Sequence, residues 1–559
     1  MSPHSFDIIV LGSGAAGLAA AVTAAWHGAK VLVLESADVL GGTTAWSGGW
    51  IWAPGTALAQ AAGFDTARDA PRRYLQQVMG NHFNAERVDA FLGAAPAMVD
   101  FFHNHTSVQF DLGGGIPDTY SHVPGAGMGG RSVIARPYDG RGLKRDTRLL
   151  RLPLRETTFH GMTIQAGADL RSFLTMTHNT SSFLHATKRV LHHTRDLALH
   201  GRGMDLRNGA ALAARLMRSA LDLGVAWHVN TTVTALLRHA NGVDGVQLAC
   251  GRILGARKGV ILATGGYGHD AARRATSFPR DDEHRSLSVP TAQGTGAALA
   301  TAIGAQFDQS AAAPAAYCPV SVVPYPGGSS GVFPHIIDRG KPGLVGVLAN
   351  GRRFCNEGLG YHDYVTALLD ATPQGQPAQS WLICDHRFLR RYGLGIVRPA
   401  PVPWRHWQRR GYLTTANTLH QLARACGIDA DGLAQTIADW NTHAADGHDP
   451  EFGRGTTAYM RLQGDPDHGP NPCVAPIVTP PFHAVRVTPG SFGTFAGLAC
   501  DGAARVLDAT GAPIAGLYCA GADAASPFGG FYPAGGINLG PAMTFGFVAG
   551  RHAVTGKRP

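Results

Sequence analysis

Two short apolar runs near the start of the chain flank a stretch of small residues. Residues 6–11 read FDIIVL and residues 29–35 read AKVLVLE, while residues 15–26 between them carry no charge. A continuous apolar run of this length is typical of a strand buried on both faces of a parallel sheet. The uncharged segment between them predicts a buried helix. The pattern therefore predicts a strand–helix–strand unit at the start of an α/β fold.

The turn between the first strand and the helix has the spacing G-x-G-x-x-G. It consists of Gly12, Ser13, Gly14, Ala15, Ala16 and Gly17. Gly12 permits the tight turn, Gly14 lets a pyrophosphate approach the backbone, and Gly17 allows close packing of helix on strand. Glu35 closes the second strand, where a ribose hydroxyl is held in such domains. These residues predict a dinucleotide site at the helix N-terminus.

A loop rich in Gly, Ser and Thr follows Glu35. Its candidate cofactor contacts are Ser36, Gly41, Gly42, Thr43, Thr44, Ser47, Gly48 and Gly49. An ordinary polar connection is the alternative interpretation. The loop resembles the one that wraps the flavin end of FAD in the fumarate reductase and 3-ketosteroid dehydrogenase superfamily, and this resemblance implies FAD. Covalent flavin in membrane-bound relatives uses a histidine in this loop; residues 43–47 read TTAWS, so we expect noncovalent FAD.

Later segments predict that the chain returns to the same domain. A helix over 208–223 leads into a β-branched strand over 231–237; strands ending in glycine turns follow at 258–266 and 513–523, and a last helix opens near 535–543. By resemblance, Val233 presents its backbone to adenine. The remaining cofactor candidates are Ala263, Thr264, Gly265, Gly521, Ala522, Asn538 and Leu539. We therefore expect a discontinuous Rossmann-like FAD-binding domain (1–281 and 486–559) with an inserted α+β substrate domain (282–485).

Composition narrows the function classes. The chain has 559 residues, too many for one compact core, and no apolar run of about eighteen residues that would predict a membrane span. Its net charge of +9 is scattered, which argues against nucleic-acid binding but leaves weak attraction to an acidic membrane surface open. The eight cysteines form no C-x-x-C pair, the histidine clusters match no metal motif, and no basic leader precedes the first strand. We expect reduced thiols, no metal and a cytoplasmic location.

Three tyrosine-bearing motifs give a more specific resemblance. They lie at residues 117–120 (PDTY), at 350–357 (NGRRFCNE), shortly before Tyr361, and at 530–536 (GFYPAGG), with further matches at 124–126, 130–132, 136–141 and 201–203. Together they resemble the bacterial 3-ketosteroid Δ1-dehydrogenases. That resemblance implies a 3-ketosteroid substrate, an external electron acceptor, and removal of a proton from carbon 2 and a hydride from carbon 1, the hydride passing to the flavin.

The resemblance also implies roles for individual residues. Tyr532 and the backbone N–H of Gly536 bind the 3-keto oxygen, Tyr361 removes the proton, and Tyr120 tunes Tyr361 through a hydrogen bond. Tyr364 is a rival for the role of Tyr361. An unperturbed phenol with a pKa near 10 is ionised to only about one part in a thousand at pH 7, so the base needs help from its surroundings. The alternative for each tyrosine is amphipathic packing.

Other functions share the same fold and cofactor. A Δ4-(5α)-ketosteroid dehydrogenase is one; a fumarate-reductase-like enoate reductase is another, with Arg136, Arg352 and Arg353 as cations for a dicarboxylate. Against the reductase, the segment after Thr494 reads FAGL and offers no polar clamp. A noncatalytic flavoprotein that serves as a carrier or sensor is the alternative outside enzymes.

Overall fold

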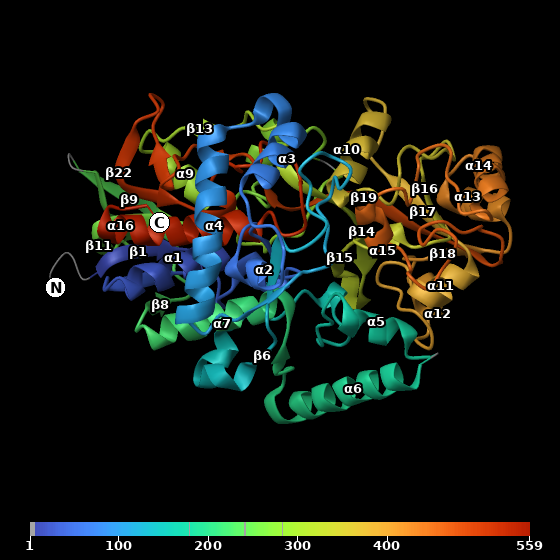
Figure 1. Ribbon diagram of the computed structural model, residues 1–559, viewed down its shortest axis with the longest axis horizontal. Helices are drawn as coiled ribbons and strands as arrows, with labels where there is room; N and C mark the ends of the chain where they lie inside the picture. Colours follow the sequence, from blue (N-terminus) through green and yellow to red (C-terminus); the bar gives the residue numbers. More distant parts are fainter. Residues whose placement is uncertain (1–5, 178, 240–241, 282, 559) are drawn as a thin grey trace.

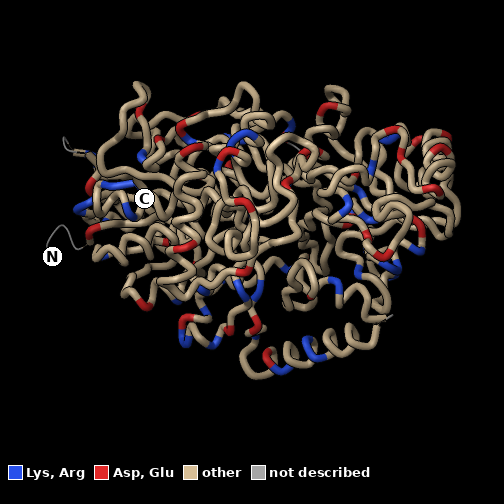
Figure 2. The backbone as a smooth tube through the Cα atoms, viewed as in Figure 1, with Lys and Arg blue, Asp and Glu red and all other residues tan. Residues whose placement is uncertain are grey.

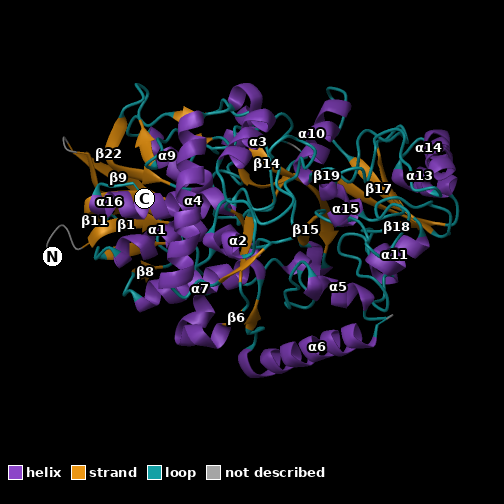
Figure 3. Ribbon diagram, viewed as in Figure 1, coloured by secondary structure: helices purple, strands orange, loops and turns teal. Residues whose placement is uncertain are grey.

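The computed structural model describes residues 6–177, 179–239, 242–281 and 283–558. Helices and strands are both abundant (Figure 3), which confirms the α/β class. In Figure 1 the sheet that contains the first strands lies at the left end, close to both termini, and a second sheet lies toward the right end. The described part of the chain includes no helix with the length and apolar character needed to cross a bilayer.

The first sheet confirms the predicted strand–helix–strand unit. Its strands, in spatial order, are β21 (Arg505–Leu507), β22 (Pro513–Cys519), β11 (Ile253–Leu262), β1 (Phe6–Leu11), β2 (Val31–Leu34) and β8 (Ala226–His228). β1 is parallel to both β2 and β11, and β11 is parallel to β22. An antiparallel hairpin of β9 (Val233–His239) and β10 (Gly242–Leu248) extends from β11. Segments far apart in sequence thus share one sheet.

Small residues let two helices pack tightly beside this sheet. α1 (Ala15–Trp26) contacts α16 (Leu539–Thr555) and α7 (Asn208–Asp222). A Cβ on Gly546 or Gly550 of α16 would lie 2.4 Å from the carbonyl oxygen of Ala16 or Ala20 respectively. Only glycine on α16 permits this close approach to the backbone of α1. The small side chains of α1 are thus explained by its close packing against α16, and not by helix propensity alone.

The glycine turn has the geometry that its spacing predicts. Gly12 has φ +101°, and a Cβ there would lie 2.1 Å from the carbonyl oxygen of Ala263. A Cβ on Gly17 would lie 2.0 Å from the carbonyl oxygen of Gly12. Close backbone packing therefore requires glycine at both positions, whereas a Cβ on Gly14 would meet only Oγ1 of Thr44, at 3.6 Å.

The second sheet forms the centre of the inserted region. In order its strands are β15 (Ser330–Pro334), β14 (Ala315–Pro324), β19 (Phe482–Thr494), β17 (Ser380–Cys384) and β16 (Leu344–Val347), with β12 (Arg285–Ser286) and β18 (Thr414–Ala416) also paired to β19. Its helices are α10 (Tyr361–Ala371), α11 (His386–Tyr392), α12 (Arg405–Arg409), α13 (Leu419–Cys426), α14 (Ala430–Ala444) and α15 (Ala458–Gln463). β19 runs unbroken through residues 485 and 486, so the sheet of the inserted region extends beyond the expected boundary.

Smaller elements cover the junction of the two regions. The sheets are β3 (Trp50–Trp52), β5 (Ser132–Ala135) and β4 (Phe110–Leu112); β6 (Tyr138–Asp139) with β7 (Asp205–Leu206); and β13 (Phe307–Asp308) with β20 (Gly497–Leu498). The helices are α2 (Ala57–Ala61), α3 (Asp69–Met79), α4 (Ala85–His105), α5 (Ala168–Thr175), α6 (Thr180–His200), α8 (Ala271–Ser277) and α9 (Thr295–Thr301). Charges of both signs are interspersed over the molecule (Figure 2), in agreement with the scattered sequence pattern.

Candidate functional site

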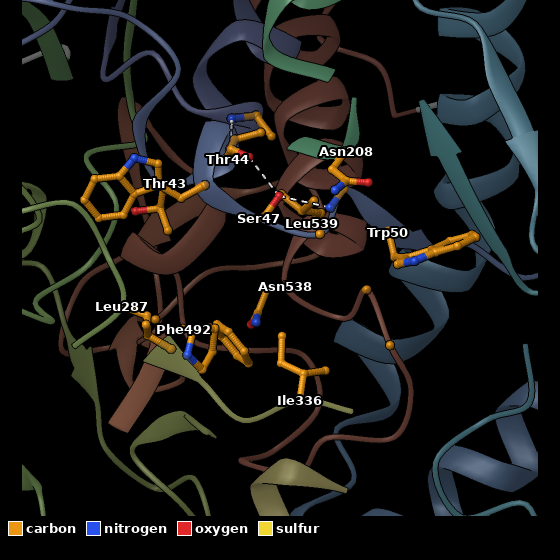
Figure 4. A pocket seen from close by; sticks show the side chains of 18 of the residues that line it. Thr43, Thr44, Ser47, Trp50, Asn208, Leu287, Ile336, Phe492, Asn538 and Leu539 are labelled. Atoms are coloured by element: carbon orange, nitrogen blue, oxygen red, sulfur yellow. Dashed lines mark hydrogen bonds between the residues drawn. The ribbon is translucent and has the colours of Figure 1, made fainter. Parts of the chain in front are cut away.

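A single cavity of about 1200 Å³ joins the glycine turn of the first region to the tyrosines of the inserted region. Figure 4 shows part of its wall, with Thr43, Thr44 and Ser47 on one side and Phe492 and Ile336 on another. Every cofactor residue predicted from the sequence lines this cavity except Gly17 and Gly41. Gly17 packs against Gly12, and the N–H of Gly41 donates to Oγ of Ser13 at 3.0 Å, so both support the wall from behind.

The N-terminus of α1 provides the phosphate end of the cavity. Gly14 caps the helix without any side-chain hydrogen bond, and the nearest atom to a Cβ placed on it is Oγ1 of Thr44 at 3.6 Å. Thr44 Oγ1 in turn accepts a hydrogen bond from the N–H of Ala15 at 2.8 Å. The open space before the helix, together with its dipole, suits a pyrophosphate.

Glu35 lies in the wall and is fixed by four donors. It accepts hydrogen bonds from the N–H and Oγ of Ser13, at 3.0 and 2.5 Å, from the N–H of Ala37 at 2.9 Å and from Oγ of Ser36 at 3.4 Å. These contacts fix the orientation of the buried side chain. Val233 lies in the same wall. Their contacts with ribose and adenine remain predictions.

The opposite end of the cofactor site is built around α16. Asn538 precedes this helix, makes no side-chain cap, and donates from Nδ2 to the hydroxyl of Tyr532 at 3.2 Å. A Cβ on Gly48 or on Gly535 would meet no atom within 4 Å, so both glycines leave room in the cavity. A helix N-terminus at each end and glycine-lined space between them fit FAD.

Asp523 is a structural part of this site that the sequence analysis missed. Its carboxylate accepts hydrogen bonds from Oγ1 of Thr264 and the N–H of Gly266, both at 2.9 Å. These bonds tie the turn after β11 to the turn after β22. Burial raises the pKa of Asp523, which the hydrogen bonds partly offset. No local motif marks this residue, because its partners lie more than 250 positions away in the chain.

Tyr361 and Tyr532 meet in the wall beyond Asn538. Tyr361 is the first residue of α10, and its ring lies 4.8 Å from the ring of Tyr532 at an interplanar angle of 76°. Phe492, from β19, packs on Tyr361 at 5.3 Å. Within the described residues, the backbone N–H of Gly536 has no hydrogen-bond acceptor. Tyr361, Tyr532 and Gly536 thus all line this cavity.

Burial dominates the electrostatics of these tyrosines. It raises the pKa of Tyr361 well above the ordinary value, and the adjacent phenol of Tyr532 raises it further. Burial also raises the pKa of Tyr532. His362, behind the pair, has its pKa lowered to about 4 by burial. These shifts keep all three side chains neutral at pH 7.

The prediction that Tyr120 forms a hydrogen bond with Tyr361 is wrong. Tyr120 does not line the cavity, and its hydroxyl donates to Oδ1 of Asp363 at 2.7 Å. A carboxylate is a stronger acceptor than a phenol, and Asp363 lies in the first turn of α10 only two residues beyond Tyr361. Burial raises the pKa of Asp363 to about 6, and its Oδ2 is buried without a partner. Tyr120 therefore reaches Tyr361 only through α10.

Tyr364 is part of the core rather than of the cavity. It is fully buried, its hydroxyl shares a hydrogen bond of 3.0 Å with Oγ of Ser380, and the guanidinium of Arg339 lies 4.9 Å above its ring. Residues three apart lie on the same side of a helix, so the difference comes from the neighbours: Tyr361 begins α10 at the cavity wall, whereas Tyr364 packs one turn further along against Phe354 and Ser380. The geometry favours Tyr361 over Tyr364 as the reactive tyrosine.

The arginines considered for a dicarboxylate lie elsewhere. Arg353 is buried against Glu357 and Asp449, with N–O distances of 2.8 Å to each. Arg136 forms a surface ion pair with Asp111 at 2.7 Å. Neither of these arginines lines the cavity, and nor does Arg352. These three residues thus offer no cation to a small dicarboxylate substrate.

Part of the wall comes from segments in which the sequence showed no motif. Tyr459 and Gln463 of α15, with Gly464 and Lys341, also line the cavity. A tyrosine or lysine in a region without periodicity or motif gives no signal that could have identified it.

Comparison with known proteins places the chain in a family. Residues 7–539 match the FAD binding domain family, to which the chain belongs. It is 38% identical, over 98% of this chain and 93% of the relative, to 4-oxocyclohex-2-ene-1-carboxylate 5-dehydrogenase of Sinomonas cyclohexanicum. It is 32% identical, over the full length of both chains, to 3-oxosteroid 1-dehydrogenase of Mycobacterium tuberculosis.

A solved structure agrees with this placement. The 3-ketosteroid Δ1-dehydrogenase of Sterolibacterium denitrificans, in complex with 1,4-androstadiene-3,17-dione, superposes with a TM-score of 0.89 at 32% identity, covering 99% of this chain and all of that one. The chain is thus an FAD-dependent oxidoreductase of a ketosteroid-dehydrogenase-like family.

Proposed function

We propose that the chain introduces a double bond beside the ketone of a ring, by the 1,2-dehydrogenation typical of 3-ketosteroids. The observation that carries this proposal is the buried pair of Tyr361 and Tyr532 in the wall of the FAD cavity. The relatives named for 3-oxosteroids support the reaction. The relative at 38% identity is named for a cyclohexene carboxylate, which leaves the size of the ring system open.

The ketone is held by two donors. The hydroxyl of Tyr532, positioned by Asn538, and the unpaired N–H of Gly536 point to one oxyanion site. Gly536 has φ +103°, and a Cβ there would lie 2.7 Å from the backbone nitrogen of Trp52, so only glycine presents its N–H in this way. Donors fixed in a water-poor cavity stabilise the enolate oxygen as the proton beside the ketone leaves.

Tyr361 takes that proton in this proposal. Its raised pKa makes its phenolate a strong base but keeps the phenol protonated at neutral pH, so turnover should rise as pH increases through the alkaline range. Bound FAD supplies the hydride acceptor. Phe492 and the rest of the apolar wall exclude water from the reacting carbons, and an external electron acceptor then reoxidises the cofactor.

The decisive experiment is anaerobic bleaching of the bound flavin. We expect 4-androstene-3,17-dione, or a single-ring ketone, to reduce the flavin and to leave a product with a new double bond between carbons 1 and 2. Tyr532→Phe should lower the rate of bleaching about 10²- to 10³-fold with normal FAD content, because one of two oxyanion donors is lost. Bleaching by 5α-steroids with a double bond formed at carbon 4 would indicate the Δ4 reaction instead. Fumarate-dependent oxidation of a reduced dye would indicate an enoate reductase, and no bleaching by any of these compounds would indicate a carrier or sensor.

A further inference from the structure

Lys341 is a largely buried cation in the cavity wall. It follows the short 3₁₀ helix Asp338–Gly340, and its Nζ donates to the carbonyl oxygen of Gly464 at 2.7 Å. Within the described residues this ammonium forms no ion pair with a carboxylate. Burial lowers the pKa of Lys341, and the nearby Asp465 only partly opposes that effect. An ammonium in this position is costly unless an anion joins it.

The carboxylates near Lys341 are bound to other groups. Asp465 accepts from the hydroxyl of Tyr392 and pairs with Arg391, both at 2.6 Å. Asp338 pairs with His335, also at 2.6 Å. These contacts hold the two acids away from Nζ. The remaining hydrogens of the ammonium are therefore available to a group that enters the cavity.

One helix relates Lys341 to the reacting tyrosines. Tyr459, at the start of α15, interacts electrostatically with Tyr361 and Tyr532, and Gly464 directly follows the end of the same helix. Lys341, bound to Gly464 beyond the end of α15, and Tyr459 at its start therefore line the same cavity as the tyrosine pair, an arrangement that suits a substrate whose ketone and anionic group are at opposite ends.

We infer that Lys341 binds a carboxylate on the substrate, and that the chain acts on a cyclic ketone carrying a carboxylate remote from the ketone. The identity of the ketone end rests on the proposed dehydrogenase function. The anionic end rests on Lys341 alone, so a binding measurement can test it separately. The carboxylate can belong to a single ring or to the far end of a steroid.

The binding test uses the FAD-loaded protein and two phenols of similar size, 4-hydroxybenzoate and neutral 4-hydroxybenzyl alcohol. The binding of each phenol is measured from the change that it causes in flavin absorbance. Lys341→Met should weaken 4-hydroxybenzoate about 10- to 100-fold, as expected for a lost charged hydrogen bond, and leave the alcohol unchanged. Lys341→Arg should restore the difference between the two ligands. Arg171→Gln is the matched control, because Arg171 lines the same cavity but is paired with Asp467 at 2.9 Å; it should keep the parent's preference for 4-hydroxybenzoate.

The pH dependence of 4-hydroxybenzoate binding tests whether Lys341 acts through its charge or through a structural role. A lysine is cationic only below its pKa, and the pKa of Lys341 is lowered. As the pH is raised, the affinity of the parent for 4-hydroxybenzoate should therefore begin to fall before the pH reaches the usual lysine value near 10.4. Lys341→Arg should keep its affinity there. Equal weakening of both phenols by Lys341→Met, or unchanged affinity for both, would overturn the inference.

Turnover then distinguishes the two sources of the carboxylate. We compare 4-oxocyclohexanecarboxylate, a 3-oxo-4-ene steroid acid and neutral 4-androstene-3,17-dione. A selective loss of kcat/KM in Lys341→Met for one of the two acids identifies the natural ring system, whereas equal loss for all three compounds contradicts the role of Lys341. If no ketone bleaches the flavin while 4-hydroxybenzoate binding still depends on Lys341, the dehydrogenase proposal fails and the anion site stands.

Discussion

The nucleotide half and the ketone half of one cavity are built in different ways. The nucleotide half uses backbone groups, glycines and a helix N-terminus from short contiguous motifs, such as residues 12–17 and 41–49. The ketone half uses side chains from separate segments, with Tyr361 on α10, Tyr459 on α15 and Tyr532 before α16. The cofactor end therefore depends on the backbone conformation of glycine-rich turns, and the ketone end on the chemistry of individual side chains. Mutations should act differently in the two halves.

The largest effect should follow a change at Gly14 in the nucleotide half. Its open Cβ direction points into the cavity, so the branched side chain of Gly14→Val would occupy space needed by the pyrophosphate. We expect loss of FAD, measured as flavin absorbance per chain. The control is Gly93→Ala in α4, since Gly93 is helical, a Cβ there would meet only the end of the Arg68 side chain at 3.5 Å, and the residue does not line the cavity. A Gly14→Val protein with a full complement of FAD would contradict the assignment of this end of the cavity.

The sequence of the nucleotide half also predicts that FAD is bound without a covalent bond. No histidine occurs among the loop residues 41–49. Acid precipitation of the holoenzyme should therefore release all of the FAD into the supernatant, one per chain. Flavin that stays with the pellet would show a covalent bond formed by another residue.

This difference also explains what the sequence could predict. Gly12 and Gly17 are required by close backbone contacts within one supersecondary unit, so their spacing alone identified them. Tyr361 and Tyr532 were found only through a family resemblance. Asp363 and Lys341 carried no signal, because their roles arise from burial and from neighbours that tertiary packing supplies. The bond expected for Tyr120 was wrong for the same reason: a closer acceptor, Asp363, was not visible in the sequence.

In the ketone half, Tyr361→Phe should remove most activity while FAD and ligand remain bound. A positioned general base contributes about 10² to 10⁴ in rate, and phenylalanine retains the packing against Tyr532 and Phe492. The measurement is the single-turnover rate of flavin reduction, with flavin perturbation as the readout of ligand binding. Tyr361→Phe reduced at the parent rate would transfer the role of base to another group.

A smaller effect is expected from Tyr120→Phe. Because the hydroxyl of Tyr120 contacts Asp363 rather than Tyr361, we treat it as a positioning residue that holds the first turn of α10. We expect a loss of about tenfold or less, with the alkaline limb of the pH profile unchanged, and a Tyr120→Phe/Asp363→Asn double variant no worse than the single ones. A limb displaced to higher pH would instead show that Tyr120 stabilises the Tyr361 phenolate directly once substrate is bound.

The smallest catalytic effect should come from Tyr364→Phe, three residues from Tyr361 on the same helix. Its hydroxyl bonds Ser380 in the core and does not reach the cavity, so removing it should lower the free energy of unfolding by about 1 kcal/mol and leave flavin reduction at the parent rate. Denaturant unfolding of the holoenzyme measures the first quantity and single-turnover reduction the second. The pair Tyr361→Phe and Tyr364→Phe thus separates chemistry from stability on one helix. If Tyr364→Phe abolished flavin reduction without loss of stability, Tyr364 rather than Tyr361 would be the reactive tyrosine of α10.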